Sequence, residues 1–154
     1  MRRRKKWLFV LLIGFAIIQF IQPAHNKSEN VLPTDVTKVY PVPSNVLTIL
    51  KTACYDCHSN NTRYPWYSSV QPGGWWLANH IASGKEELNF NEIGTYSIRR
   101  QINKLRSIEN SIKDGTMPLS SYALLHKDAR LTTQQKELIV AWVGRIKDSL
   151  EMVH

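Results

Sequence analysis

The sequence predicts an all-α domain that follows a short apolar N-terminal segment. Three observations support this fold class. Apolar residues recur every three or four positions from Ile98 to Ile112 and again from Leu138 to Leu150, which is the spacing of one helix face. No stretch has the alternating pattern of a strand, and there is no internal repeat. With 154 residues, 43% of them hydrophobic, the chain can form one compact domain plus a targeting segment.

Residues 1–24 have the composition of a signal peptide or a signal anchor. Five consecutive cations, Arg2 to Lys6, precede an uncharged and almost wholly apolar stretch from Trp7 to Ile21. Such a cluster stays in the cytoplasm, so we expect the rest of the chain in the periplasm or another extracytoplasmic space. The stretch is short for a full span. No small-x-small cleavage site follows it, and this favours an uncleaved membrane anchor over a cleaved signal peptide.

The formal charge of +8 does not indicate nucleic-acid binding. Five of the 20 Lys and Arg residues belong to the N-terminal cluster, which leaves 15 basic against 12 acidic residues elsewhere. The remainder lacks the stripe of basic residues interleaved with aromatic ones that a nucleic-acid-binding surface requires. No nucleic-acid partner is therefore predicted.

Residues 25–43 are predicted to be a tether, because they contain three prolines and no sustained apolar period. The folded domain is predicted over residues 44–152. Its first helix begins near Ser44, a candidate N-cap, and its apolar residues Val46, Leu47, Ile49 and Leu50 lead directly into Cys54 at the C-terminal end of the helix.

Three further helices are expected in this domain. After a loop over residues 60–74, a short helix from Trp75 to Ser83 is expected to end at Gly84. The long helix that contains Ile98 to Ile112 is expected to stop at Gly115. The last helix begins at Thr132, which forms a capping-box pattern with Gln135 three residues later.

A Cys-Tyr-Asp-Cys-His pentapeptide at residues 54–58 contains both cysteines of the chain. At positions i, i+3 and i+4 of one helical turn, Cys54, Cys57 and His58 project from the same face. This is the spacing at which a polypeptide attaches haem covalently: the thiols form thioethers with the two vinyl groups, and the imidazole becomes an axial ligand of the iron. One covalently bound haem c is therefore the predicted cofactor.

A disulfide loop, a thiol redox pair and a zinc site are the alternatives for the two cysteines. A redox pair would follow a strand at the start of a helix, and neither it nor a disulfide gives His58 a role. A structural zinc site needs four ligands, but the sequence has no second Cys pair and no closely spaced His pair. The haem interpretation is favoured because it uses all three residues.

Met117 is the predicted sixth ligand of the iron. It lies between Gly115 and Pro118, just beyond a predicted helix, where it belongs to no apolar helix stripe. His80, on the predicted short helix, is the main alternative as sixth ligand. His126 and an open or water-bound site are the remaining alternatives.

Tyr64, Trp66 and Trp76 are the other predicted haem-binding residues. Tyr64 and Trp66 belong to a loop that is dense in aromatic residues, and Trp76 shares a helix face with His80. Such rings can form the wall of a site for a large flat ligand. The alternative is that they fill a small core.

The chain resembles the bacterial exported haem-binding domain family, within the single-haem cytochrome c superfamily. The resemblance covers about residues 40–147 and rests on Cys54–Asn60, Tyr64–Tyr67, His80, Leu88–Phe90, Gly115–Pro118, Tyr122, His126 and the segment from Leu131 to Trp142. It implies a cytochrome c-like helical fold around one covalently bound haem c, with His58 as the proximal ligand. It assigns no particular reaction.

The predicted function is an extracytoplasmic one-electron carrier that exchanges electrons with redox partner proteins. With His58 and Met117 on the iron, no coordination position is left for a substrate, so we assign no catalytic residue. One alternative is a haem enzyme, either a small peroxidase or a haem subunit of a larger oxidoreductase, with His80 or Arg63 as a distal acid–base group. Another alternative is a haem-based redox or gas sensor.

Overall fold

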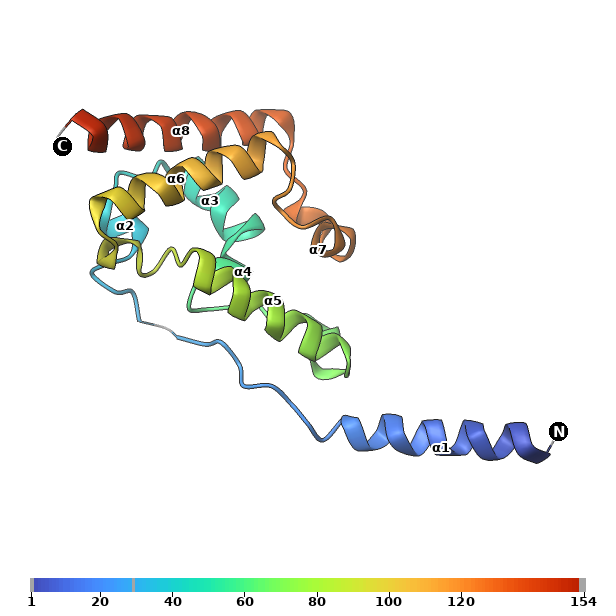
Figure 1. The fold of residues 1–154 in the computed structure, drawn as a ribbon. Coiled ribbons are helices and arrows are strands. Elements are labelled where there is room, and N and C mark those ends of the chain that lie inside the picture. Colours follow the sequence, from blue (N-terminus) through green and yellow to red (C-terminus); the bar gives the residue numbers. More distant parts are fainter. Residues whose placement is uncertain (1, 29, 153–154) are drawn as a thin grey trace.

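The computed structural model describes residues 2–28 and 30–152, and these residues form helices and connecting segments without any strand. The all-α prediction is confirmed. In chain order the elements are α1 (Arg2–Ile18), α2 (Val36–Val39), α3 (Ser44–Ala53), α4 (Tyr55–His58), η1 (Trp66–Ser69), α5 (Gly73–Glu87), η2 (Ile93–Thr95), α6 (Ile98–Lys113), α7 (Ser120–Leu125), η3 (Lys127–Ala129) and α8 (Thr133–Met152), as Figure 1 shows.

Helices α6 and α8 pack against each other and form one layer of the domain (Figure 1). Both follow their predicted limits. Gly115 comes directly after the C-cap of α6 and has a φ of 68°, the left-handed conformation that commonly ends a helix. The capping box before α8 is formed, since Thr132 N–H donates to Gln135 Oε1 at 2.9 Å and Gln135 N–H donates to Thr132 Oγ1 at 3.2 Å.

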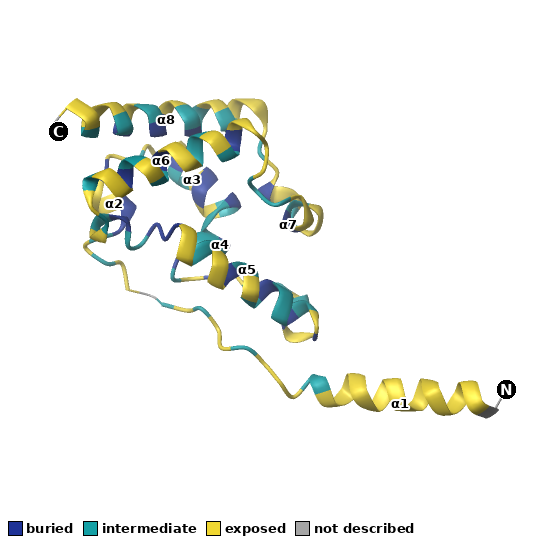
Figure 2. Cartoon of the chain, viewed as in Figure 1, coloured by how far each residue is buried: buried dark blue, intermediate teal, exposed yellow. Residues whose placement is uncertain are grey.

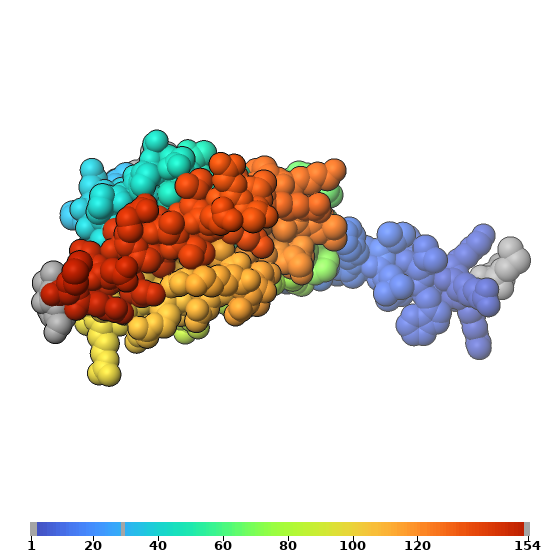
Figure 3. Space-filling model, turned by 90° about the horizontal axis from the view of Figure 1, so that it is seen from above, coloured from blue at the N-terminus to red at the C-terminus, as the bar shows by residue number. Residues whose placement is uncertain are grey.

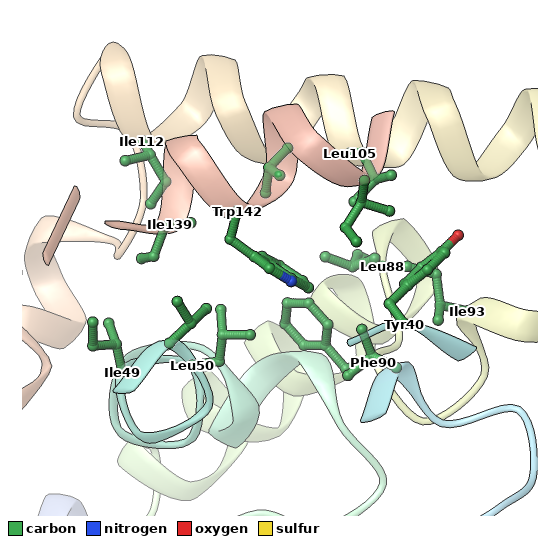
Figure 4. Packing of buried hydrophobic residues seen from close by; sticks show 14 residues of the cluster. Tyr40, Ile49, Leu50, Leu88, Phe90, Ile93, Leu105, Ile112, Ile139 and Trp142 are labelled. Carbon is green, nitrogen blue, oxygen red and sulfur yellow. The ribbon is translucent and has the colours of Figure 1, made fainter. Parts of the chain in front are cut away.

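The main hydrophobic core lies under this layer, where the buried faces of α3, α6 and α8 meet (Figure 2). Trp142 points from α8 towards Phe90, and both side chains are 1% exposed (Figure 4). The indole N–H of Trp142 donates to the carbonyl of Pro41 at 3.1 Å, so the largest core side chain has a partner for its one polar group. This core fixes α3, and with α3 the position of the Cys-Tyr-Asp-Cys-His turn.

Helix α3 leads directly into that turn, as the sequence predicts. Cys54 is both the C-cap of α3 and the N-cap of α4, and its carbonyl accepts hydrogen bonds from Cys57 N–H at 3.2 Å and His58 N–H at 3.0 Å. The predicted N-cap role of Ser44 is wrong. Ser44 is already the first helical residue, and Pro43 occupies the N-cap position.

The predicted end of a helix at Gly84 is also wrong, because α5 continues through it to Glu87. A Cβ atom at Gly84 would lie 2.7 Å from the carbonyl oxygen of Cys57. The absence of a side chain therefore lets α5 approach α4 closely, as glycine permits where two backbones meet. The predicted loop over residues 60–74 contains the short helix η1, and the short helices α7 and η3 were not predicted.

The predicted tether at residues 25–43 contains part of the core. Val36 is fully buried and Tyr40 is 8% exposed; the Tyr40 hydroxyl donates to Gln101 Oε1 on α6. Four positions apart, the two side chains lie on the same face of the short helix α2. One helical turn is too short to show an apolar period in the sequence, and so this element was missed.

Residues 19–28, which we call the N-terminal strap, are hydrogen-bonded to the domain. Asn26 is its main contact: its amide nitrogen donates to Ser59 O at 2.8 Å and to Thr62 Oγ1 at 2.9 Å, and its amide oxygen accepts from Lys85 Nζ at 2.8 Å. Further along the strap, the indole N–H of Trp75 donates to Ile21 O at 2.8 Å.

The fully buried Gln71 completes these strap contacts. Its backbone N–H donates to Gln19 Oε1 at 2.8 Å, and its side-chain amide donates to Gln22 Oε1 at 3.0 Å. Because a buried amide needs hydrogen-bond partners, the two strap glutamines stabilise this corner of the domain.

Helix α1 projects away from the rest of the molecule (Figures 1 and 3) and exposes its apolar side chains, among them Trp7 at 71%. Among the described residues, no helix has both the length and the apolar character that crossing a membrane requires. Membrane attachment through residues 1–24 stays a prediction.

Candidate haem site

Two cavities of about 200 and 160 Å³ meet where α4 faces α5, α6 and the segment before α7. They share five lining residues, Ala53, His58, Glu87, Met117 and Pro118, and so form two lobes of one cleft. The larger, which we call the first lobe, is also lined by Cys54 and by residues of α6. The second lobe is also lined by Cys57 and His80. The structure thus brings the cysteine pair, both histidine candidates of this region and the methionine to one cleft.

His58 is oriented by a backbone carbonyl. Its Nδ1 lies 3.0 Å from the carbonyl oxygen of Leu88, which accepts a hydrogen bond when that nitrogen carries the proton. Burial lowers the pKa of His58 and so favours the neutral ring, although the carbonyl of Leu88 acts in the opposite direction. A neutral imidazole with Nδ1 protonated leaves the Nε2 lone pair free to bind a metal, and such second hydrogen bonds fix the orientation of ligand histidines.

Cys54 and Cys57 are free thiols, one in each lobe. Burial raises the pKa of Cys54 to about 12, with a smaller contribution from Cys57, and raises that of Cys57 to about 11. Both groups are therefore protonated at neutral pH. Thiol redox pairs depend on a lowered pKa, so this environment disfavours the redox alternative for the two cysteines.

Asp56, the central residue of the pentapeptide, was not among the predicted site residues, but its hydrogen bonds hold α4 in place. It is 5% exposed. Its Oδ1 accepts from the backbone N–H and Nε of Arg63 at 2.9 and 3.2 Å, and its Oδ2 accepts from Arg63 Nη2 at 3.0 Å and from the Tyr122 hydroxyl at 2.6 Å. Burial and this last hydrogen bond raise the pKa of Tyr122. Asp56 thereby joins α4 to the following loop and to α7.

Arg63 is consequently not placed as a distal acid–base group. Its guanidinium is paired with Asp56 and also donates to the carbonyl of Thr52 at 3.0 Å. Within the described chain it lines neither lobe of the cleft. The sequence places Arg63 seven residues after Asp56 but gives no indication that the two side chains pair.

Met117 lines both lobes, together with His58. The turn that positions it is held by the C-terminal end of α6, where the carbonyl of Ser111 accepts from Thr116 N–H at 3.0 Å and from Met117 N–H at 3.3 Å. A thioether is a soft donor found opposite histidine in haem proteins. The structure thus places Met117 in the same cleft as His58, and its role as sixth ligand stays a prediction.

The two alternative histidines lie in different surroundings. His80 lines the second lobe; its Nδ1 is 2.7 Å from the carbonyl of Trp76, and its ring lies 4.3 Å from the Trp76 ring. His126 lines neither lobe. Its Nε2 is 2.9 Å from the Tyr67 hydroxyl, and its ring stacks on Tyr122 at 4.1 Å between centroids. Only His80 remains next to the cleft as an alternative sixth ligand.

The predicted aromatic wall is not found around the cleft in the described structure. Tyr64 stacks on His25 of the strap at 4.2 Å, and Trp66 is 82% exposed. Trp76 contacts the cleft only through His80. The rings that do line the lobes are Phe90 and Tyr122. Phe90 belongs to Leu88–Phe90, one of the segments on which the family resemblance rests. This segment was the sequence signal that could have identified Phe90 as a site residue.

The cleft suits a flat ligand with one metal better than a bare metal ion. Its donor groups are two thiols, two imidazoles, one thioether and the carboxylate of Glu87, set among apolar side chains such as Leu88, Ile108 and Ile112. The described part of the chain contains no group of three or more His, Cys, Asp or Glu residues arranged to hold an ion. This donor set fits haem, whose ring supplies the remaining iron ligands.

A family model described as "haem-binding domain" matches residues 13–145 of the chain. The chain belongs to the haem-binding domain family. The match spans most of the sequence of this haem-binding protein and includes the N-terminal strap, the cysteine pair and Met117. Searches of curated proteins and of solved structures found no match. Its membership of the cytochrome c superfamily stays a prediction.

Proposed function

We propose that this haem-binding domain protein carries one haem c, attached through Cys54 and Cys57, and works as an extracytoplasmic one-electron carrier. His58 and Met117 are the proposed axial ligands of the iron. The observation that supports this proposal is that all four residues line one cleft, although Met117 comes from a distant segment of the chain.

Each of these residues has a distinct task in the proposal. The thiols of Cys54 and Cys57 hold one edge of the porphyrin by thioether bonds, and His58, aligned by the carbonyl of Leu88, binds the iron through Nε2. When bound, haem supplies an iron that changes oxidation state by one electron. Met117 would supply the second protein ligand of the iron, and methionine ligation raises the reduction potential.

The surroundings of the site favour electron transfer over chemistry at a substrate. Asp56, with Arg63 and Tyr122 on its carboxylate, ties α4 to α7 and so connects the two sides of the cleft. A cleft held in this way changes little when the iron changes its charge. The redox partner proteins are proposed to contact the domain on the outer side of the membrane.

The proposed location rests on the N-terminal segment. Five cations followed by an apolar stretch support export, with attachment to the inner membrane through residues 1–24 as the favoured form. The strap contacts of Gln19 and Gln22 favour retention of the segment, because removing residues 1–24 would take both side chains away from the buried Gln71.

A haem enzyme or a haem-based sensor is the second candidate function. One observation favours it: His80 lines the second lobe beside Met117. If Met117 leaves the iron, His80 is close enough to the cleft to act on a small molecule there as an acid or base. The other proposed distal group, Arg63, is paired with Asp56 and supports neither alternative.

The absorption spectrum of the protein, co-expressed with haem maturation machinery in an exporting host, tests these proposals. A reduced α-band that survives denaturation, and that the Cys54→Ala, Cys57→Ala double variant loses, supports covalent haem c. Indifference of the reduced protein to carbon monoxide then supports the electron carrier. Binding of carbon monoxide would favour the enzyme or the sensor, and fully retained covalent haem in the double variant would refute the attachment.

A further inference from the structure

A row of polar side chains lines the first lobe from α6. Lys104, Ser107 and Ser111 are spaced by three and four residues, which places them on one face of the helix. Ile108 and Ile112 line the same lobe. The α6 wall of this lobe therefore combines apolar side chains with one ammonium group and two hydroxyls.

Lys104 is the one Lys or Arg among the described residues that line either lobe, and Glu87 is the one acidic residue there. The side chain of Lys104 is 20% exposed, and its Nζ lies 3.5 Å from Oε2 of Glu87, whose side chain is 80% exposed. An ion pair of this length with so exposed a partner contributes little to stability. The ammonium therefore remains able to take another anionic partner.

Haem brings such a partner. Its two propionate carboxylates lie on the edge of the ring opposite the vinyl groups, and a carboxylate that enters a protein cleft needs charge-assisted hydrogen bonds. We propose that Lys104 binds one haem propionate, and that Glu87 competes for the same ammonium. This inference rests on the proposed haem site. It adds a residue that binds the propionate edge of the ring, which is the edge opposite the cysteines.

Other cations of α6 do not have this position. Lys113, near the end of the same helix, lines neither lobe and pairs with Glu109 at 2.5 Å. Changing Lys113 to Gln removes the same charge from the same helix without touching the cleft. Lys113→Gln is therefore the matched control for Lys104→Gln.

The test uses mesohaem, in which ethyl groups replace the vinyl groups, so the unmodified chain binds it without forming thioethers. Its dimethyl ester lacks the propionate charges. We expect Lys104→Gln to weaken mesohaem binding about tenfold, the scale of one charge-assisted hydrogen bond, and to leave binding of the ester within about twofold. Lys113→Gln should change neither affinity. Glu87→Gln should strengthen mesohaem binding, because it removes the competitor.

An equal loss for mesohaem and its ester, or no loss for either, would overturn the proposal. A second measurement uses the haem-loaded protein: Lys104→Gln should lower the reduction potential relative to wild type and Lys113→Gln, since removing a nearby cation favours the ferric state. Equal potentials in the three proteins would also overturn it. Failure of wild type to acquire haem would instead refute the proposed function, which separates the two results.

Discussion

Replacing Gly84 with alanine tests the argument that the α4–α5 contact sets the geometry of the site. The new Cβ would lie 2.7 Å from the carbonyl oxygen of Cys57 and 3.1 Å from its Cβ. Neither atom belongs to a flexible side-chain end, so the helices must separate by about 0.7 Å to restore ordinary contact. Such a shift moves Cys57, and with it one of the two proposed haem attachment points.

The expected free-energy change follows from two opposing effects. Overpacking a tight contact costs about 1–3 kcal/mol, and alanine in a helix interior recovers up to about 1 kcal/mol relative to glycine. Because the contact is with backbone, the cost is near the upper end of its range, and the net destabilisation should be about 1–2 kcal/mol. In a chain of this length, each kcal/mol lowers the midpoint of thermal unfolding by roughly 2–4 °C.

Urea unfolding of the full chain measures this change, with Gly144→Ala as the control. A Cβ at Gly144, inside α8, meets nothing within 4 Å, so the same substitution should stabilise the protein by up to about 1 kcal/mol. The yield of attached haem after co-expression with maturation machinery gives a second measure and should fall for Gly84→Ala alone. Equal stabilities of the two variants would refute the close-approach argument.

Three other predictions follow. Met117→Ala should abolish the weak far-red charge-transfer band of Met-ligated ferric haem c and lower the potential while haem stays attached; persistence of the band would exclude Met117 as ligand. Asn26→Ala should destabilise the fold by about 1–3 kcal/mol and speed proteolysis of the strap, whereas the exposed Asn110→Ala should do neither; equal digestion would contradict the role of the strap. Burial raises the pKa of Tyr40 to about 12, above its ordinary value of about 10, so the stability it contributes is complete below about pH 10 and is lost towards pH 12. Urea midpoints across this range should fall less steeply for Tyr40→Phe, and identical slopes would show that Tyr40 is not responsible.

Features encoded within a short stretch were predicted from the sequence. Helices α6 and α8 have a regular apolar period and local end signals, a left-handed Gly115 for one and the Thr132 capping box for the other. The turn that contains Cys54, Cys57 and His58 depends only on residue spacing. Each of these features is determined by neighbours along the chain, so no tertiary information is needed.

Features that depend on distant contacts were not predicted. Glycine commonly ends a helix, and Gly84 was predicted to do so. Its actual role is to allow two helices to approach closely, and this depends on the carbonyl of Cys57 on another helix. Asn26 lies in a polar segment without periodicity, and only the fold brings Ser59 and Lys85 to its amide. Trp66 was predicted to contact a ligand from the local density of aromatic residues; its side chain is 82% exposed and lines neither lobe, and its role stays a prediction.

The two sides of the cleft also differ in this way: one is formed by residues close in the sequence, and the other depends on contacts between distant segments. On the His58 side, the ligand and both thiols belong to one turn, so their relative positions survive as long as that turn survives. On the Met117 side, the turn is held by Ser111 at the end of α6, and α6 reaches the cleft only through its packing on α8 and the core around Trp142. Loosening the core, which also positions α3, therefore separates Met117 from the His58 turn, whereas the imidazole and the two thiols keep their spacing within that turn. Loss of the methionine ligand should accordingly precede loss of the proximal histidine when the domain begins to unfold.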